Sequence, residues 1–208
     1  MRTPHSYHHG NLKHALLEAS LDLIRKGGPG AFTLREVARR AGVSHNAPYR
    51  HFRDKEALLA ALAAEGFDRL TAAMVRAAES ASGPLERFRA SGRGYVEFAL
   101  RYPQHFAVMF EAPGRMAAYP ETQAAGARAF GTLVRHVEAC QAEQLLPAGD
   151  PQPYALLAWS MVHGVAKLAI GGRLPLATAA AVLRFTDTAT GALWRGLSHA
   201  LAAGEKSP

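Results

Sequence analysis

The sequence has few of the features that would place it in a secreted or membrane-bound class. It contains a single cysteine, Cys140, so no internal disulfide can form, which is typical of proteins in a reducing cytosol. It has no uncharged apolar run of about 18 residues, the length that a membrane-spanning helix needs. The first ten residues are polar and lack the apolar core of a secretory leader. We therefore expect a cytoplasmic protein that makes no contact with a membrane.

Strand patterns are also scarce. Leu and Ala dominate, β-branched residues are few, and no stretch alternates apolar with polar residues over the length of a strand. Apolar residues recur instead at helical spacing between breaks that contain Gly or Pro. The sequence predicts an all-α fold of about nine helices. The expected helices are residues 11–28, 34–40, a short segment after Ser44, then 55–80, 85–102, 104–111, 121–146, 154–171 and 176–203.

Negative charge is scarce in the N-terminal quarter of the chain. Residues 1–55 carry ten Lys/Arg but only four Asp/Glu, a net charge of +6, whereas the remaining 153 residues carry +1. A basic surface attracts polyanions such as nucleic acid, because each cation placed near a phosphate releases a counterion. A solvated basic face without a partner is the alternative at this point.

Histidines are frequent, but their spacing does not favour a metal site. His8 and His9 are adjacent, and His45 and His51 are six residues apart, whereas ligands on one helix face lie three or four residues apart. The sequence contains no Ser/His/Asp arrangement, phosphate-binding loop or HExxH-type motif. We expect no catalysis, no cofactor and no metal.

The strongest local signal is a capping box, in which Thr33 and Glu36 satisfy free N–H groups at the start of a short helix. The turn Ala41-Gly42-Val43 follows, and Ser44 is a candidate N-cap for another short helix. Asp54 is placed to cap a third helix. Two short helices joined in this way predict a helix-turn-helix, which places its second helix in the major groove of DNA.

The string ALLEAS…GGPGAFTLREVARRAGVSHNAPYRHFRDKEALLAAL carries an ordered set of residues across these helices. The set is Thr33, Val37, Ala38, Gly42, Val43, Ser44, Tyr49, Phe52, Lys55, Leu58 and Leu59. Through these residues, positions 10–70 resemble the DNA-binding domain of the TetR family of bacterial transcriptional regulators. The segments YHHGNL and AWSMVHGVAKL, the latter with Trp159, His163 and Gly164, are similar to one subgroup of that family.

The resemblance implies three parts: an arm and DNA-binding domain at residues 1–55 with the helix-turn-helix at 33–52, a connecting helix at 56–82, and a ligand-binding and dimerisation domain at 83–208. It also implies a homodimer, formed through the last two long helices, that binds double-stranded DNA at a palindromic operator. We expect a repressor that a small apolar or aromatic effector releases. An activator of the same family, or a non-regulatory helical small-molecule-binding protein, is the alternative.

The expected DNA contacts divide into base edges and phosphates. His45, Asn46, Ala47 and Pro48 lie where a recognition helix would begin; Asn can bond adenine, and Ala47 or Pro48 can touch a thymine methyl. The expected phosphate contacts are Thr33, Ser44, Tyr49, His51 and Lys55. Residues expected in an N-terminal arm are Tyr7, His8 and His9. The competing interpretations are that Thr33 and Ser44 only cap helices, that His51 is a surface residue and that the arm makes no contact.

Pro48 departs from the TetR pattern, in which this position usually holds Leu, Ile or Phe. If Ser44 is the N-cap, one helical hydrogen bond is lost because proline has no N–H group; if the helix starts near Asn46, only about one turn remains. In either case Ala47 is biased away from helical backbone angles, because it precedes a proline. We expect an irregular or tight start to the recognition helix.

Aromatic residues and methionine in the larger part suit an apolar or aromatic ligand. The candidate pocket residues are Phe67, Tyr95, Phe98, Phe106, Met109, Phe110, Phe130, Trp159 and His163. Trp159 and His163 are four residues apart and therefore share a helix face. Core packing of Trp159, His163 and Gly164 is the alternative. A helical enzyme or a membrane-surface protein fits less well, because neither catalytic groups nor one long amphipathic basic face is present.

Overall fold

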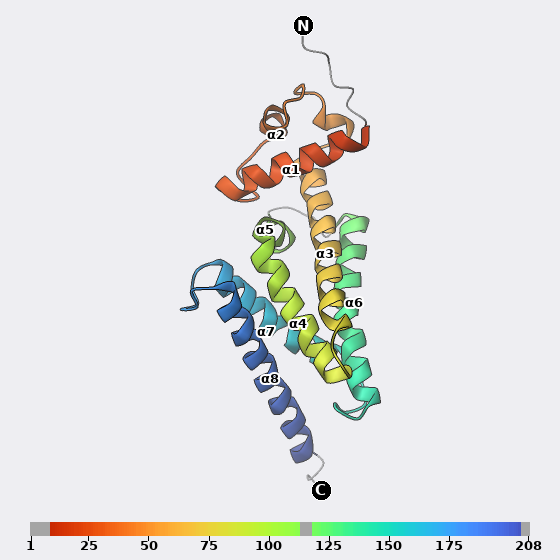
Figure 1. Ribbon diagram of the computed structural model, residues 1–208. Coiled ribbons are helices and arrows are strands. Elements are labelled where there is room, and N and C mark those ends of the chain that lie inside the picture. Colours follow the sequence, from red (N-terminus) through yellow and green to blue (C-terminus); the bar gives the residue numbers. More distant parts are fainter. Residues whose placement is uncertain (1–8, 113–117, 205–208) are drawn as a thin grey trace. The chain divides into compact units, whose positions relative to one another are not determined.

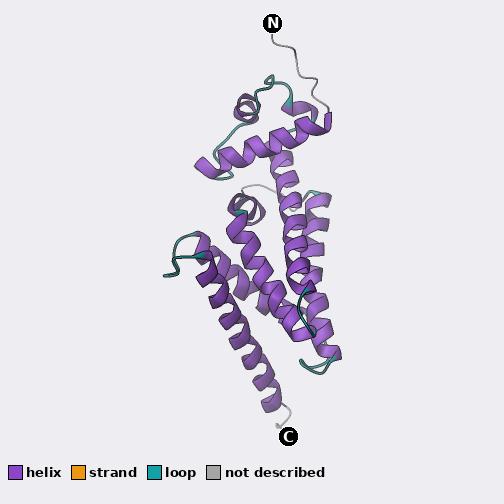
Figure 2. Ribbon diagram, viewed as in Figure 1, coloured by secondary structure: helices purple, strands orange, loops and turns teal. Residues whose placement is uncertain are grey.

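The computed structural model describes residues 9–112 and 118–204, and every regular element among them is a helix (Figure 2). The elements are α1 (His9–Gly27), α2 (Leu34–Arg40), the 3-10 helix η1 (Pro48–Arg50), α3 (Lys55–Glu79), α4 (Pro84–Arg101), α5 (Pro103–Glu111), α6 (Pro120–Ala142), α7 (Gln152–Ile170) and α8 (Ala179–Gly204). The all-α prediction is confirmed, and the eight α-helices and η1 of the described residues agree with the expected total of about nine helices. Within the described ranges, no helix is both long enough and apolar enough to cross a membrane.

The described residues group into two compact units. The first draws on Met1–Gly66 and Gln104–Ala124, and the second on Phe67–Pro103 and Ala125–Pro208. Helix α3 passes from one unit to the other, because the division falls between Gly66 and Phe67. The three-part division at residues 55 and 82 stays a prediction.

In the first unit, α1 packs against α2 and α2 against η1. Leu16 of α1, Val37 of α2 and Leu58 of α3 are fully buried. An ion pair also joins the two helices, because Arg40 donates to the Asp22 carboxylate at 2.6 Å. The hydrogen bond from Arg40 lowers the pKa of Asp22 below its ordinary value of 3.8. This exposed ion pair lies at the edge of the contact between α1 and α2 and adds to their apolar packing.

The end of α2 explains how the chain reaches η1. The N–H of Val43 donates to the carbonyl of Ala38 at 3.0 Å, and the N–H of Gly42 donates to that of Arg39 at 3.3 Å. This pair of bonds is a Schellman motif, which satisfies free carbonyls at the end of a helix and needs a left-handed residue. Gly42 takes that conformation with φ of +69°.

Asp54 caps α3 as the sequence predicts. Its Oδ1 atom accepts a hydrogen bond from the N–H of Ala57 at 2.7 Å. Farther along α3, Gly66 lies against α5: a Cβ atom at this position would be 2.6 Å from Met109 Sδ. Thr122 at the start of α6 donates to the carbonyl of Ala60 at 3.0 Å, and this bond is buried.

In the second unit, α4, α7 and α8 pack against one another (Figure 1). Val96 and Phe98 of α4 and Ala166 of α7 lie in its core. Gly92 allows α4 to approach both other helices, because a Cβ atom there would meet Val162 at 3.3 Å and Thr190 at 3.5 Å. Small residues at the crossing therefore let these helices pack closely.

Two helix ends lie three or more residues from their predicted positions. Helix α6 stops at Ala142 instead of residue 146, because Gln144 has a φ of +56° and the N–H groups of Leu145 and Leu146 turn back to the carbonyl of Cys140. The turn buries Leu146, so this residue, which was expected in the helix, packs into the core from a loop. Helix α8 begins at Ala179 instead of residue 176, and the Thr178 hydroxyl caps it by accepting from the N–H of Ala181 at 3.1 Å.

Candidate nucleic-acid interface

Thr33 holds the start of α2 through a complete capping box. Its hydroxyl accepts the N–H of Glu36 at 3.3 Å and donates to the Glu36 carboxylate at 2.9 Å. The same carboxylate accepts the backbone N–H of Thr33 at 2.8 Å. These two bonds from Thr33 lower the pKa of Glu36, with the side-chain bond contributing most. The predicted cap is confirmed, and the exposed Thr33 side chain is rigidly placed.

The segment from Ser44 to Phe52 is a turn followed by η1, so the short helix expected after Ser44 is a single 3-10 turn with the tight start predicted for it. Pro48 is the physical reason. In an α-helix the carbonyl of Ser44 would accept the N–H of residue 48, which proline lacks. That carbonyl instead accepts the N–H of Ala47 at 2.9 Å, which is a tighter turn. The carbonyl of Pro48 then accepts the N–H groups of His51 and Phe52, at 3.0 and 2.9 Å.

Of the two starts considered from the sequence, the one near Asn46 that leaves about one turn agrees with the structure, whereas the cap by Ser44 and the expected backbone of Ala47 do not. The N-cap of η1 is Ala47, and no side chain caps it, so Ser44 does not act as the predicted cap. Ala47 has φ of −59° and ψ of −41°, which is helical despite the proline that follows. Ala47 and Pro48 are both buried, and packing of these two side chains outweighs the local preference.

Residues 44–49 include buried side chains, which anchor this segment, and exposed ones, which are available to DNA. Ser44, His45 and Asn46 are exposed, and the Tyr49 side chain is 52% exposed. Pro48 is fully buried, so it leaves no surface for a thymine methyl and acts as the anchor of the segment. The structure therefore presents the polar candidates together and places the two apolar ones in the core.

His51 is half-buried beside Phe52, with 6.4 Å between ring centroids. Its Nε2 atom is buried and forms no hydrogen bond with any part of the chain that the structure describes. A phosphate oxygen therefore cannot reach Nε2 in this conformation.

Lys55 has an internal partner that sequence reasoning missed. Its Nζ atom donates to the carbonyl of Gly30 at 2.6 Å and lies 4.7 Å from the centre of the Phe32 ring. Lys55 thus ties the start of α3 to the loop before α2, in addition to any contact with DNA. No periodicity or motif could have indicated this bond, because it joins residues 25 positions apart.

Arg53 was not among the predicted site residues. Its guanidinium donates to the Asp54 carboxylate at 3.0 Å and to the Tyr119 hydroxyl at 2.9 Å. It also lies 5.2 Å from the centre of the Tyr119 ring. The hydrogen bond to Tyr119 is the main reason that the pKa of Arg53 is raised. Arg53 therefore connects the loop after η1 to the residue before α6.

The expected arm lies mostly outside the described residues. Tyr7 and His8 belong to the undescribed part, and His9 begins α1. Their proposed contact with DNA stays a prediction.

In the second unit, Tyr95, Trp159 and His163 form a hydrogen-bonded cluster. The Tyr95 hydroxyl accepts the Trp159 Nε1–H at 3.3 Å and shares a hydrogen bond of 2.9 Å with His163 Nδ1. The Trp159 ring also meets the rings of His163 and Phe130, with centroids 6.0 and 6.1 Å apart. Burial raises the pKa of Tyr95 far above its usual range, so its hydroxyl stays protonated. Trp159 and His163 are half-buried, so this cluster reaches the surface of its unit.

The other candidate pocket residues are divided between the two units. Phe67 and Phe98 belong to the second unit with the cluster, whereas Phe106, Met109 and Phe110 belong to the first. Phe98, Phe106 and Met109 are buried, and the Phe106 and Phe110 rings pack with centroids 4.8 Å apart. Within each unit these side chains contribute to the core.

Two family models match this chain. "Bacterial regulatory proteins, tetR family" matches residues 16–62, which include α2, η1 and the capped start of α3. "Tetracyclin repressor-like, C-terminal domain" matches residues 88–192, about half of the chain. The chain belongs to the TetR family. The family description assigns it to the regulatory proteins and not to the enzymes.

The chain is also similar to a solved structure and to curated repressors. A solved structure of a protein with unknown function from Rhodococcus sp. RHA1 is 41% identical, with a TM-score of 0.80 over 94% of this chain and 100% of that chain. The class A tetracycline repressor protein from transposon 1721 of Escherichia coli is 48% identical over 48 residues, which are 23% of this chain. The repressor KstR of Mycolicibacterium smegmatis is 38% identical over 72 residues, which are 35% of this chain. These matches cover only 22% and 35% of the two curated relatives.

The subgroup with the Trp–His–Gly signature stays a prediction within the TetR family. The structure shows the rings of Trp159 and His163 in contact, whereas Gly164 has open space where a Cβ atom would lie. In the part of the chain that the structure describes, no group of three His, Cys, Asp or Glu residues is placed to hold a metal ion.

Proposed function

We propose that this TetR family member is a homodimeric repressor that binds a palindromic operator and leaves it when a small molecule binds. The observation that carries the proposal is the exposed segment Ser44–Asn46 and Tyr49, held between the capped helix α2 and the buried Pro48. In a helix-turn-helix the residues at the start of the second element contact base edges in the major groove, and these exposed residues lie around the start of η1. The family match to residues 16–62 supports this role.

We infer separate roles for the exposed residues. Asn46 and His45 read base edges, since Asn bonds adenine at two positions. Ser44 and Tyr49 contact phosphates and set the register of the segment. Thr33, His51 and Lys55 remain candidate phosphate contacts, and Tyr7, His8 and His9 remain the candidate arm.

The homodimer is proposed to form through α7 and α8. These helices expose large apolar side chains: Leu156, Leu157, Leu168, Ile170 and Phe185. Ser160 is exposed and Gly164 has open space above it, so another helix can approach α7 closely. A dimer of this kind must place its two DNA-binding segments about 34–36 Å apart to reach successive major grooves.

Release by an effector follows if the ligand binds one arrangement of the dimer better than the other. The cluster of Tyr95, Trp159 and His163 supports an aromatic or apolar effector, because it combines rings packed edge to face with polar atoms that fix orientation. Repression is favoured over activation because the two curated relatives are named repressors.

A gel-shift experiment tests the DNA-binding proposal. The protein is titrated onto the DNA upstream of its own gene and onto a scrambled fragment, at low and high salt. We expect a selective shift on the upstream fragment, with affinity falling steeply as salt rises because bound phosphates release counterions. Equal binding to both fragments would contradict an operator-binding repressor. A reporter with and without the protein then distinguishes repression from activation.

A further inference from the structure

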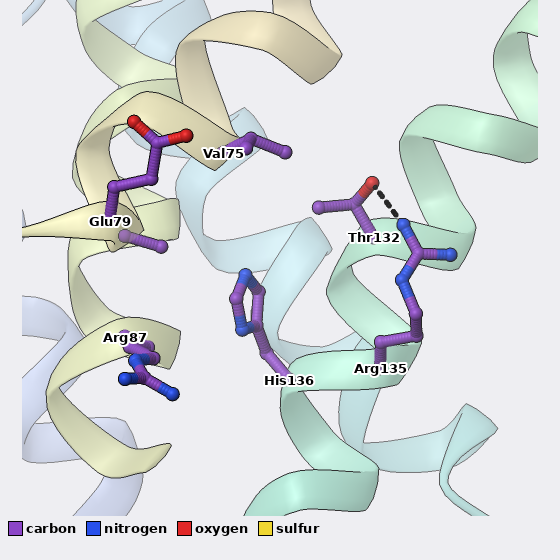
Figure 3. Close-up of a pocket in the computed structure, with 7 residues that line it drawn as sticks. Val75, Glu79, Arg87, Thr132, Arg135 and His136 are labelled. Carbon is purple, nitrogen blue, oxygen red and sulfur yellow. Dashed lines mark hydrogen bonds between the residues drawn. The ribbon is translucent and has the colours of Figure 1, made fainter. Parts of the chain in front are cut away.

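A cavity of about 400 Å³ opens in the second unit, between the end of α3, the start of α4 and the middle of α6 (Figure 3). Its lining residues are Val75, Ala78, Glu79, Arg87, Thr132, Arg135 and His136. The volume is within the range of small-molecule sites, roughly 300–1,000 Å³. The Tyr95–Trp159–His163 cluster contributes none of the lining, so this cavity is a separate candidate site.

One wall of the cavity is apolar. Val75 is 39% exposed although it is a large aliphatic residue, and Ala78 lies buried one turn farther along α3. An exposed valine above a buried alanine leaves apolar surface that a ligand can cover.

Basic groups face this wall. Arg87 donates to the carbonyl of Ala81 at 3.3 Å, and Arg135 donates to the Thr132 hydroxyl at 2.9 Å. Among the residues that the structure describes, no carboxylate forms an ion pair with either guanidinium. Glu79 is the acidic member of the lining, so positive charge is in excess. The Thr132 hydroxyl itself donates to the carbonyl of Arg128 at 3.0 Å, which fixes it as the acceptor for Arg135.

His136 adds a polar atom without a partner. Its Nε2 atom is buried and forms no hydrogen bond with the described part of the chain. The imidazole projects from α6 into the cavity, as Figure 3 shows. Burial lowers the pKa of His136, and the positive charges of Arg135 and Arg87 lower it further. The two guanidinium groups and the imidazole are therefore close enough to influence one another. A buried ring nitrogen that forms no hydrogen bond destabilises the fold, unless a ligand or a water molecule forms that bond.

We propose that this cavity binds a small organic carboxylate. The anionic group lies against Arg87, Arg135 and His136, and the apolar body covers Val75 and Ala78. The proposal deepens the proposed function by adding a site and a chemical class for an effector. It rests on that function only for the consequence that binding changes the affinity for DNA.

Calorimetry on the full-length protein without DNA tests the site, with hexanoate as the probe and hexanamide as its uncharged analogue. We expect hexanoate to bind at least about tenfold more tightly, because hydrogen bonds between charged groups contribute more than neutral ones. The double variant Arg87→Gln/Arg135→Gln should lose that preference. The matched control is Arg76→Gln, an exposed arginine of α3 outside the lining, which should bind hexanoate as the wild type does.

Equal binding of hexanoate and hexanamide to the wild type, or unchanged hexanoate binding by the double variant, would overturn the proposal. The comparison of the two ligands needs no variant, and thermal melts of the variants check that they fold. The gel shift without any ligand tests the proposed function separately. If the protein does not select operator DNA but still prefers hexanoate, the carboxylate site is supported and the repressor role is contradicted.

Discussion

At the scale of single residues, Pro48 has two effects that oppose each other. Its missing N–H group prevents an α-helical bond to the carbonyl of Ser44, which shortens the second helix to the 3-10 helix η1. Its side chain is fully buried and anchors the segment. The exposed residues of this short element are therefore fixed by the packing of Pro48, because η1 is too short to fix them through helical hydrogen bonds.

Asn46 is the residue on which base selectivity should depend most. We expect Asn46→Ala to reduce the preference for operator over scrambled DNA by about 1–3 kcal/mol, because a bidentate contact with adenine is lost. Binding to scrambled DNA should change little. Gel shifts on both fragments at one salt concentration measure the difference.

Tyr49→Ala is the matched comparison for Asn46→Ala, since Tyr49 is also exposed but is assigned to phosphate. It should weaken binding to both fragments by a similar factor. An Asn46→Ala protein that retains full selectivity would show that another residue reads the bases.

At the scale of elements, the α1–α2 pair should be sensitive to acid through Asp22. Its pKa is lowered in the folded protein, chiefly by the hydrogen bond from Arg40. The charged carboxylate therefore stabilises the fold above its ordinary pKa of 3.8, and this contribution is lost as pH falls through the lower folded value. Asp22→Asn should be less stable than the wild type at pH 6, and the gap should close as the pH falls below 4.

Urea unfolding of both proteins between pH 6 and pH 3 measures this effect. Arg40→Gln serves as the control: in a protein with this change, the stability difference between the chain with Asp22 and its Asp22→Asn variant should narrow, while the ion pair of Asp22 with Arg25 at 3.2 Å remains. A difference between wild type and Asp22→Asn that stays constant with pH would rule out the ion pair as its cause.

The contact between α3 and α4 depends on Gly94. A Cβ atom at this position would lie 2.7 Å from the carbonyl oxygen of Ala73 and 2.9 Å from the Cβ atom of Ala77. Backbone cannot move away as a flexible side chain can, so Gly94→Ala should lower the free energy of unfolding by about 1–3 kcal/mol. Thermal or urea unfolding gives the value.

Gly131→Ala on α6 is the control for Gly94→Ala. Its Cβ atom would meet only the end of the Arg135 side chain, at 3.6 Å. Alanine is the better helix former, so this variant should be as stable as the wild type or more stable by up to about 1 kcal/mol. Equal stability of the Gly94 and Gly131 variants would mean that α3 and α4 do not approach so closely.

At the scale of the whole molecule, the proposed dimer should depend on Gly164. No atom lies within 4 Å of a Cβ atom built there, so the first side-chain atom of a Gly164→Leu variant meets no other part of its own chain. In a dimer through α7 and α8, the added side chain would push the partner helix away. We expect dissociation to increase at least about tenfold in analytical ultracentrifugation, for a loss of roughly 1.4 kcal/mol or more.

Arg76→Leu is the control for Gly164→Leu, because it adds apolar bulk to an exposed position of α3, outside α7 and α8. It should leave the dimer intact. If Gly164→Leu assembles as the wild type does, Gly164 faces solvent in the dimer and the interface lies elsewhere.

Sequence alone determined the features that depend on neighbours along the chain. Helical periodicity predicted most of the helices, the capping box at Thr33 and Glu36 and the Asp54 cap were located correctly, and the motif at residues 33–59 led to the TetR family. These features rest on spacings of two to four residues, which the order of residues specifies directly.

Tertiary structure decided what depends on residues far apart in the chain. Burial of Ala47 and Pro48 kept Ala47 helical against its local preference, and Lys55 and Arg53 found partners at Gly30 and Tyr119. The cavity with Arg87, Arg135 and His136 likewise forms only when α3, α4 and α6 meet. Packing between distant segments sets these contacts, and because burial can outweigh local preference, no pattern along the sequence specifies them.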